Sequence, residues 1–381
     1  MAQTAGSSRM AWVDNMRTFI ILLVVNMHAC VTYSHVGGWY LKLPPEPDLA
    51  LKIPFLIWQG HLQAFFMGLL FFIAGYFSEK SLAKKGRADF LRERLIRLGL
   101  PTLFFMLVLR PLTVWGIMKS PPITSLPQLL EHYSRYLTSG YFIGATGPLW
   151  FAFALLIFSF AFAALRDPKL GQQNPCPAPR AIHLILFCFV LVGTTFAIRF
   201  IFPLGTDVIN FQLGFFPQYI FGFWLGALSA RHSWLQSLAE SSLAKRAGIA
   251  AVIGGPILLA TVIGLGGPPG KDSYPYAGGL HWQAFGLAGW EQMTGPALGL
   301  GVIYLFRQRF NFENGISNWL SKHSFGVYVL HTPILVALSY AFQPWQLDPF
   351  TGSFLLTATG LTLSYAAAAV FLCIPGFKWV L

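Results

Sequence analysis

The chain consists of apolar runs long enough to cross a membrane, separated by short polar segments. A spanning helix needs roughly 20 mostly apolar residues. The 381-residue sequence contains ten such runs, at 11–34, 54–78, 95–118, 147–165, 181–202, 212–230, 247–266, 284–306, 324–343 and 353–374. This pattern predicts an all-α polytopic membrane protein of about ten transmembrane helices, forming one domain over residues 1–381 with a polar tail at residues 1–10.

The positive charges predict the orientation of these helices. Ten spans put both ends of the chain on one side, and the loops and ends of that side hold 19 of the 26 Lys and Arg residues. Because loops rich in Lys and Arg stay in the cytoplasm, we expect cytoplasmic termini. The first apolar run is too long for the core of a signal peptide and is expected to be retained as the first helix.

The amino-acid composition also indicates a protein that is surrounded by lipid. Only 10% of the residues are charged, against about 25% in soluble domains. The net charge of +12 does not indicate nucleic-acid binding, because the basic residues lie between apolar spans, where topology and anionic headgroups require them. The four cysteines form no CxxC pair, so neither a disulfide framework nor a metal cluster is predicted.

The first run contains "RTFIILLVVNMH", from Arg17 to His28. Eleven helical residues turn through about 1100° and rise about 16 Å, so Arg17 and His28 share one face of the helix. Asp14 precedes Arg17 by three residues and is placed to pair with it. A histidine at membrane depth is costly unless it faces the bundle interior or a wet cavity. His28 is therefore either an interhelical hydrogen-bonding group or a base near the midplane.

A second basic cluster opens the third run, in "RADFLRERLIRLGLP". Arg94 and Arg97 are three residues apart, so their guanidinium groups can converge on one phosphate, with Arg92 close by. Topology and lipid headgroups are the alternative explanation for each single arginine.

Few other polar groups lie at membrane depth. His331, in "SFGVYVLHTPIL", is expected at a depth similar to His28, and Glu291, in "GWEQM", is the one carboxylate placed well inside a run. His61 lies in the outer half of the second run. Such groups either make an acid–base pair or proton relay, or serve as structural hydrogen-bonding groups.

The longer loops on the side opposite the termini are rich in Pro, Gly, Trp and Tyr. Trp39, Tyr40, His281 and Trp282 belong to them. Such residues anchor helices at the membrane interface, or they form an aromatic rim that stacks on sugar rings. The composition leaves both interpretations open.

Taken together, these motifs resemble membrane acyltransferase family 3, the integral-membrane O-acyltransferases. The arginine, ten residues and histidine of Arg17 and His28 match the family's first helix, and four further elements follow in order: "FFIAGYFS" at 71–78, "RLIR" at 94–97, "GPLWF" at 147–151 and "SFGVYVLHTPI" at 324–334. The resemblance covers about residues 12–378. It is greatest to the glucan biosynthesis protein C branch, whose opening pattern is matched by Asp14, Arg17, His28, Tyr33 and Ser34.

The resemblance implies an activity and a location. It implies transfer of an acyl group, succinyl before acetyl, from cytoplasmic acyl-CoA to a hydroxyl of a periplasmic or exported glycan, in the bacterial cytoplasmic membrane. Acyl-CoA would be a co-substrate, and no tightly bound cofactor or metal is expected. The partners would be acyl-CoA, the glycan and membrane lipids, without nucleic acid; a homo-oligomer is left open.

The resemblance also suggests roles for the residues above. The catalytic candidates are His28, Arg17, Glu291 and His331. The candidates for binding the CoA phosphates are Arg17, Arg92, Arg94 and Arg97. The candidates for binding the acceptor are Asp14, His61, Trp39, Tyr40, Trp150, His281 and Trp282. Direct transfer and an acyl-histidine intermediate both remain open. The alternative functions are a proton-coupled transporter of a small solute or glycan, supported by Glu291 and the buried histidines, and a structural or partner-binding membrane subunit.

Overall fold

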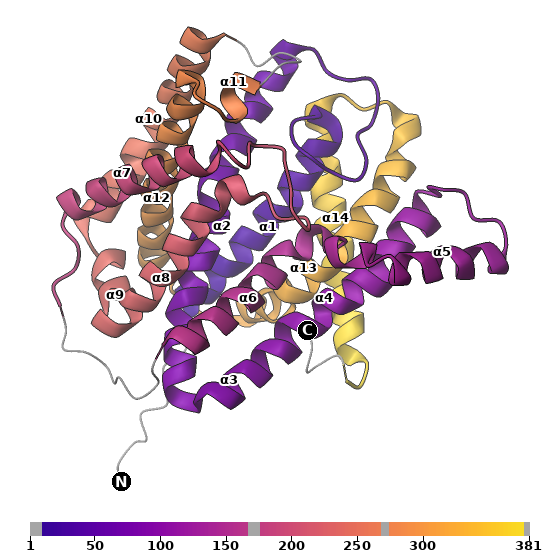
Figure 1. The fold of residues 1–381 in the computed structure, drawn as a ribbon, viewed down its shortest axis with the longest axis horizontal. Helices are drawn as coiled ribbons and strands as arrows, with labels where there is room; N and C mark the ends of the chain where they lie inside the picture. Colours follow the sequence, from indigo (N-terminus) through magenta and orange to yellow (C-terminus); the bar gives the residue numbers. More distant parts are fainter. Residues whose placement is uncertain (1–9, 167–175, 268–273, 377–381) are drawn as a thin grey trace.

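The computed structural model describes residues 10–166, 176–267 and 274–376. These residues form a bundle of helices (Figure 1). The α-helices are α1 (Ala11–Ser34), α2 (Leu49–Lys85), α3 (Arg87–Arg94), α4 (Leu100–Phe104), α5 (Leu126–Thr138), α6 (Trp150–Leu165), α7 (Ala181–Ile198), α8 (Phe216–His232), α9 (Trp234–Ala239), α10 (Ser242–Gly266), α11 (Tyr274–Ala277), α12 (Trp282–Arg309), α13 (Gly315–Phe342) and α14 (Pro349–Cys373). The α3 and α4 helices belong to one helical segment, Arg87–Ile117, which includes π-helical turns.

The predicted fold class is confirmed. Each of the ten predicted runs overlaps a helix, and eight helical segments of the described residues are long and apolar enough to cross a membrane. The remaining two runs correspond to α8, which has 17 residues, and α12, which contains Gln283, Glu291 and Gln292. The exact number of spans stays a prediction. Apart from Met10, the predicted polar tail lies outside the described residues.

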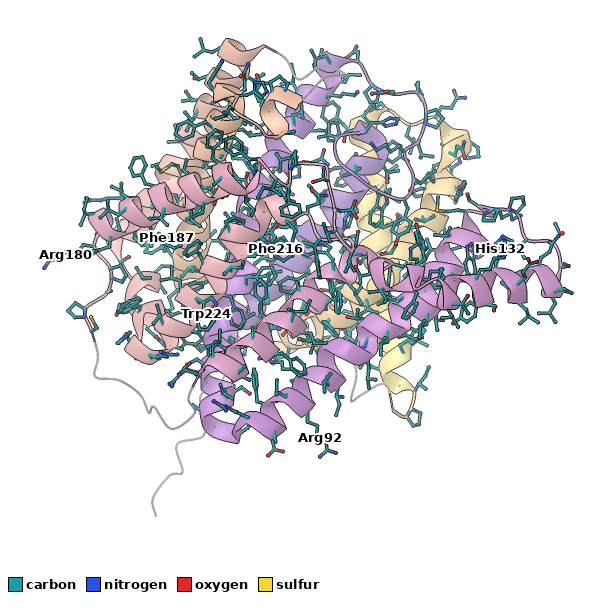
Figure 2. All side chains as sticks on the ribbon, in the orientation of Figure 1. Arg92, His132, Arg180, Phe187, Phe216 and Trp224 are labelled. Atoms are coloured by element: carbon teal, nitrogen blue, oxygen red, sulfur yellow. The ribbon has the colours of Figure 1, made fainter. Side chains whose placement is uncertain are left out.

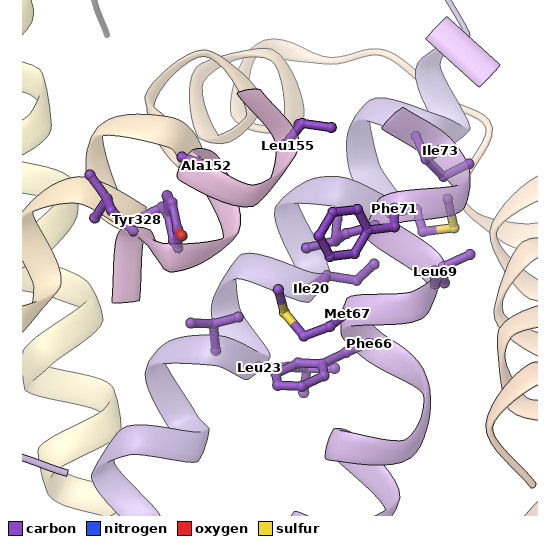
Figure 3. Close-up of a cluster of buried hydrophobic side chains, with 14 of the residues drawn as sticks. Ile20, Leu23, Phe66, Met67, Leu69, Phe71, Ile73, Ala152, Leu155 and Tyr328 are labelled. Atoms are coloured by element: carbon purple, nitrogen blue, oxygen red, sulfur yellow. The ribbon is translucent and has the colours of Figure 1, made fainter. Parts of the chain in front are cut away.

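The core lies where α1, α2, α6, α8 and α13 meet. Ile20 and Leu23 of α1, Phe66 and Phe71 of α2 and Leu155 of α6 belong to one buried cluster (Figure 3). In lipid this cluster gains little from hydrophobic burial, because the surrounding acyl chains are equally apolar, so packing and polar contacts must hold the helices together.

Glycines let two of these helices approach closely. A Cβ atom added to Gly75 of α2 would lie 1.9 Å from the carbonyl oxygen of Phe223 in α8, and one added to Gly226 of α8 would lie 1.9 Å from the carbonyl oxygen of Phe72. Any side chain at either position would therefore force the helices apart. This contact explains the glycine within "FFIAGYFS".

The described ends of the chain lie at the same end of the bundle. Asn15 near the start of α1 donates hydrogen bonds to the carbonyl oxygens of Phe310 and Phe312, just after α12. Trp319 near the start of α13 stacks on Tyr365 near the end of α14, with ring centroids 5.4 Å apart. We call this the arginine end, because Arg17 and Arg94 also lie there, and the opposite end, with residues 35–48, the loop end. The cytoplasmic location of the arginine end stays a prediction.

Two buried glutamates form ion pairs that connect segments distant in sequence. Glu79 of α2 binds Arg166 at the end of α6 (2.8 Å) and Arg231 of α8 (3.1 Å). Arg199, which follows α7, binds Glu291 of α12 at 2.5 Å. The charge count grouped Arg199 with the loop cations; it lies directly after α7, but its side chain is fully buried.

The loop end also contains a helix that the sequence did not predict. The α5 helix lies within a segment expected to be a loop and projects sideways from the bundle (Figure 1). Its Tyr133 and Tyr136 hydroxyls donate to the carbonyl oxygens of Leu107 and Met106 at 3.0 and 2.7 Å. Those bonds fix α5 against the end of the Arg87–Ile117 segment.

Candidate active site

A single large cavity runs along the inner face of α1. Its volume is about 2060 Å³, and its lining includes residues from both ends of the bundle. On α1 alone it extends from Trp12 to Val31, which corresponds to about 28 Å of helix. The hydrocarbon core of a bilayer is about 30 Å thick, so the cavity spans most of that thickness.

The mouth at the arginine end is strongly basic. Arg17, Lys80, Lys84, Lys85, Arg92, Arg94, Arg97 and Arg307 line it, against the acidic residues Asp14, Asp89 and Glu93. Arg92 extends from α3 at the edge of the bundle (Figure 2). An excess of guanidinium and ammonium groups around one opening favours a polyanionic ligand such as a phosphate ester.

Arg94 and Arg97 differ in their contacts. Arg94 donates to the hydroxyl of Ser78 at 3.2 Å and lies over the ring of Phe90. This bond connects the sequence elements at 71–78 and 94–97. Arg97 is 68% exposed and lies 3.4 Å from Glu93, which also binds Lys85. Arg94 is thus held in place, while Arg97 stays accessible to a ligand.

His28 lies beside two other aromatic rings. Its imidazole stacks on the indole of Trp39, with centroids 3.9 Å apart and planes 16° apart. On α13, His331 lies nearly parallel to His28, with centroids 5.4 Å apart. His28 and Trp39 line the cavity. The structure therefore brings together His28, His331 and Trp39, which come from two helices and a loop.

Three polar ring atoms of this cluster form no hydrogen bond within the described residues. His331 donates from Nδ1 to the carbonyl oxygen of Tyr328 at 2.8 Å, which leaves Nε2 as the acceptor. Nε2 of His331, Nδ1 of His28 and Nε1 of Trp39 are buried and have no hydrogen-bond partner among the described residues. Leaving such groups unpaired costs free energy, so the cluster is suited to a bound polar molecule.

The loop end of the cavity is aromatic and polar. Tyr40, Arg110, Tyr141, Asp207 and Asn210 line it. Burial raises the pKa of Tyr40 to about 12, although nearby Arg110 acts in the opposite direction. Tyr40 is therefore a neutral phenol at physiological pH, able to donate and accept hydrogen bonds.

Nine of the predicted site residues line this cavity, and a tenth contacts one of them. Asp14, Arg17, His28, Trp39, Tyr40, Arg92, Arg94, Arg97 and Trp150 line it, and His331 lies against His28.

Besides His331, which contacts His28 without lining the cavity, four predicted site residues lie outside the cavity lining. Glu291 is paired with Arg199. His61 packs edge-on against Trp290 and donates from Nδ1 to the carbonyl oxygen of Ile57. His281 precedes the first turn of α12 as its N-cap residue, and Trp282 is 51% exposed.

Several lining residues were not identified from the sequence, among them Gln63, Lys80, Arg110, Tyr219 and Tyr328. Gln59 and Gln63 are one turn apart in an apolar run, which is a signal that could have indicated an inward-facing polar stripe. Arg110 and Tyr219 had no such signal, because only the packing of the bundle turns them toward the cavity.

Comparison with known proteins identifies the family of the chain. The family described as "Acyltransferase domain" matches residues 10–371. Proteins named "Glucans biosynthesis protein C" are similar to this chain: that of Salmonella gallinarum is 26% identical over 239 residues, and those of Salmonella typhi and Salmonella typhimurium are 25% identical over 238 residues.

The alignment covers 59% of this chain and 59% of each of these relatives. No solved structure matches the chain. The family match, by contrast, extends over nearly all of the bundle, including the helices that carry Arg17, His28, Arg94 and His331. This multi-pass membrane protein therefore belongs to acyltransferase family 3.

Proposed function

We propose that this protein transfers an acyl group from acyl-CoA, entering at the arginine end, to a hydroxyl of a glycan that enters at the loop end. The observation that carries this proposal is the cavity, which joins the basic mouth, His28 and the aromatic loop end in one space. A donor and an acceptor from opposite sides of a membrane need such a passage to meet.

The donor fits the basic half of the cavity. The phosphates of CoA would lie among Arg17, Arg92, Arg94 and Arg97, and the pantetheine arm would follow α1. Arg17 and His28 are eleven residues apart, about 16 Å along the helix. This is about half the thickness of the hydrocarbon core and is similar to the reach of the pantetheine arm, so the thioester would arrive beside His28.

The chemistry fits His28. A neutral imidazole is a suitable base for a hydroxyl that attacks a thioester. The proton would pass from the hydroxyl to His28 and then to the departing thiolate. Stacking on Trp39 fixes the ring, and His331 provides a second imidazole beside it. An acyl-histidine intermediate is the alternative chemistry for the same residues.

The acceptor fits the loop end. Trp39, Tyr40 and Trp150 present aromatic surface to the cavity, and aromatic rings stack well on sugar rings. The similar proteins from Salmonella are named for glucan biosynthesis. We propose a periplasmic or exported glucan as acceptor and succinyl, before acetyl, as the acyl group, with the bacterial cytoplasmic membrane as the location.

A proton-coupled transporter is the alternative function. Its support in the sequence was Glu291 together with the buried histidines. Glu291 pairs with Arg199 and does not line the cavity. The family match favours the transferase.

Sealed membrane vesicles of both orientations test the proposal. Radiolabelled succinyl-CoA and acetyl-CoA would be offered from outside, with a glucan acceptor on both sides of the membrane. We expect label on the glucan when the arginine end faces the added donor, and little label in the opposite orientation. Label transfer that is equal in both orientations, or absent in both, contradicts the proposal.

A further inference from the structure

The cavity wall contains a polar side chain to which no role has yet been given. Tyr219 of α8 is 1% exposed and lines the cavity. Its ring packs against Phe71, with centroids 4.9 Å apart, and against Trp150, at 5.6 Å. Packing on these rings fixes the direction in which the hydroxyl points.

The hydroxyl of Tyr219 keeps its hydrogen available. Gln63 donates from Nε2 to the Tyr219 oxygen at 3.3 Å. A phenol both accepts and donates, and this bond uses only its capacity to accept. Among the residues that the structure describes, no acceptor is bonded to the Tyr219 hydrogen. Because Gln63 and Tyr219 both line the cavity, the free O–H can serve a bound molecule.

The contact between α1 and α2 places this donor near the height of His28. Ser34 at the end of α1 donates to the side chain of Gln59 in α2 at 3.0 Å, and the two helices run in opposite directions. Measured along α2 from Gln59, Gln63 lies about 6 Å toward the arginine end. Measured along α1 from Ser34, His28 lies about 9 Å in the same direction. The two residues are thus within about one helical turn of the same height.

A buried ion pair lies near Tyr219. Tyr219 is within electrostatic range of both Glu291 and Arg199. Nη1 of Arg199 and Oε1 of Glu291 are buried without a partner among the described residues. The two charges act on the Tyr219 hydroxyl in opposite directions, so the pair is a structural part of the wall around the donor. This arrangement gives Glu291 a role that does not require contact with substrate.

We infer that Tyr219 is a catalytic residue that donates its O–H to the carbonyl oxygen of the acyl thioester. The inference rests on the proposed function and adds the group that binds the negative charge formed during transfer. Donors fixed in advance at a developing oxyanion are among the largest contributions to acyl-transfer catalysis.

The electrons and protons of this step balance. The acceptor oxygen bonds to the acyl carbon while its proton passes to His28. The carbonyl electron pair moves onto the oxygen, where Tyr219 donates to it. When the pair returns, the carbon–sulfur bond breaks, and the CoA thiolate takes the proton from His28. The products are the acylated glycan and CoA thiol.

Tyr219→Phe tests the inference, because it removes only the oxygen and keeps the ring. We expect kcat to fall by about 10²–10³-fold, with the KM for acyl-CoA changed by less than about threefold. Hydrolysis of acyl-CoA by water, measured without glycan, should fall by a similar factor, since it forms the same oxyanion.

Tyr76→Phe is the matched control. Tyr76 is also 1% exposed and also accepts from a glutamine, Gln236, at 2.9 Å, but it does not line the cavity. We expect its kcat to stay within about twofold of wild type. Stabilisation by CoA against heat verifies that each variant is folded. If Tyr219→Phe does not fold, Gln63→Leu provides the second test, with a smaller loss of kcat at unchanged KM for acyl-CoA.

Two results would overturn the inference. One is an unchanged kcat in Tyr219→Phe. The other is normal hydrolysis together with a raised KM for the glycan, because Tyr219 would then bind the acceptor. Failure of the proposed function is distinguishable, because wild type itself would then neither hydrolyse acyl-CoA nor label the glycan.

Discussion

The hydroxyl of Tyr328 donates a hydrogen bond to the backbone carbonyl oxygen of Pro148, 180 residues away in sequence. The carbonyl oxygen of Tyr328 accepts from Nδ1 of His331. Tyr328 therefore joins the "GPLWF" segment, which contains Trp150, to the helix that holds His331 against His28. Two sequence elements that are far apart along the chain thus form one wall of the cavity.

Tyr328→Phe should weaken this wall. The carbonyl oxygen of Pro148 would lose a buried hydrogen bond, at a cost of about 1–3 kcal/mol, and we expect a lower melting temperature and reduced transfer. Thermal unfolding in detergent measures the first effect. Tyr340→Phe, on the exposed side of the same helix, should behave as wild type; equal melting temperatures for the two variants would argue against a structural role of the Tyr328 hydroxyl.

Arg94→Gln should impair donor binding rather than chemistry. Loss of one charged hydrogen bond to a phosphate corresponds to about 1.5–3 kcal/mol, so the KM for acyl-CoA should rise about 10- to 100-fold and the heat stabilisation by CoA should shrink. Arg135→Gln is the control, because Arg135 forms a surface pair with Glu131 away from the cavity. An unchanged KM in Arg94→Gln would remove Arg94 from the donor site.

Glu291→Gln should be unstable, because it leaves Arg199 as a buried charge without a counterion. Breaking a buried pair typically costs about 3–5 kcal/mol. Combining it with Arg199→Met should restore part of the stability, and thermal unfolding of the two single variants and the double variant measures the coupling. A Glu291→Gln protein as stable as wild type but inactive would instead indicate a direct chemical role.

Trp39→Phe and Trp39→Ala separate two roles of this indole. If Trp39 mainly positions His28, the alanine variant should lose about tenfold in kcat, an effect in line with the 0.5–1.5 kcal/mol of an aromatic pair, while the phenylalanine variant keeps most of the activity. If Trp39 mainly binds sugar, the KM for the glycan should rise in both variants. Steady-state kinetics with varied glycan concentration decides between these results.

Features that depend on a single helix, such as its length and the residues that share one face, could be predicted from the sequence. The periodicity of α1 places Arg17 and His28 on one face, because a helix converts spacing into direction. The lengths of the apolar runs predict the fold class for a similar reason, since the thickness of the bilayer sets the length of a spanning helix. Arg94 and Arg97 were identified in the same way.

Contacts between segments could not be predicted in this way. Trp39 was expected to be a rim residue of an outer loop, but hydrogen bonds such as that from Leu43 N to Thr32 O fold the loop back onto α1, and its ring stacks on His28. Arg199 was counted among loop cations because it lies at the end of an apolar run. Its partner Glu291 is 92 residues away, and only the packing of α7 against α12 brings the two charges together.

The most direct test of the account is acyl transfer by His28→Ala in membrane vesicles, compared with wild type and with His132→Ala. His132 lies on α5 (Figure 2) and does not line the cavity. The label would be radioactive succinyl-CoA or acetyl-CoA, with a glucan as acceptor. Removal of a general base should lower transfer by about 100-fold or more, while His132→Ala stays near wild type and all three proteins keep their stabilisation by CoA. A folded His28→Ala protein that transfers label as fast as wild type would contradict the central role of His28.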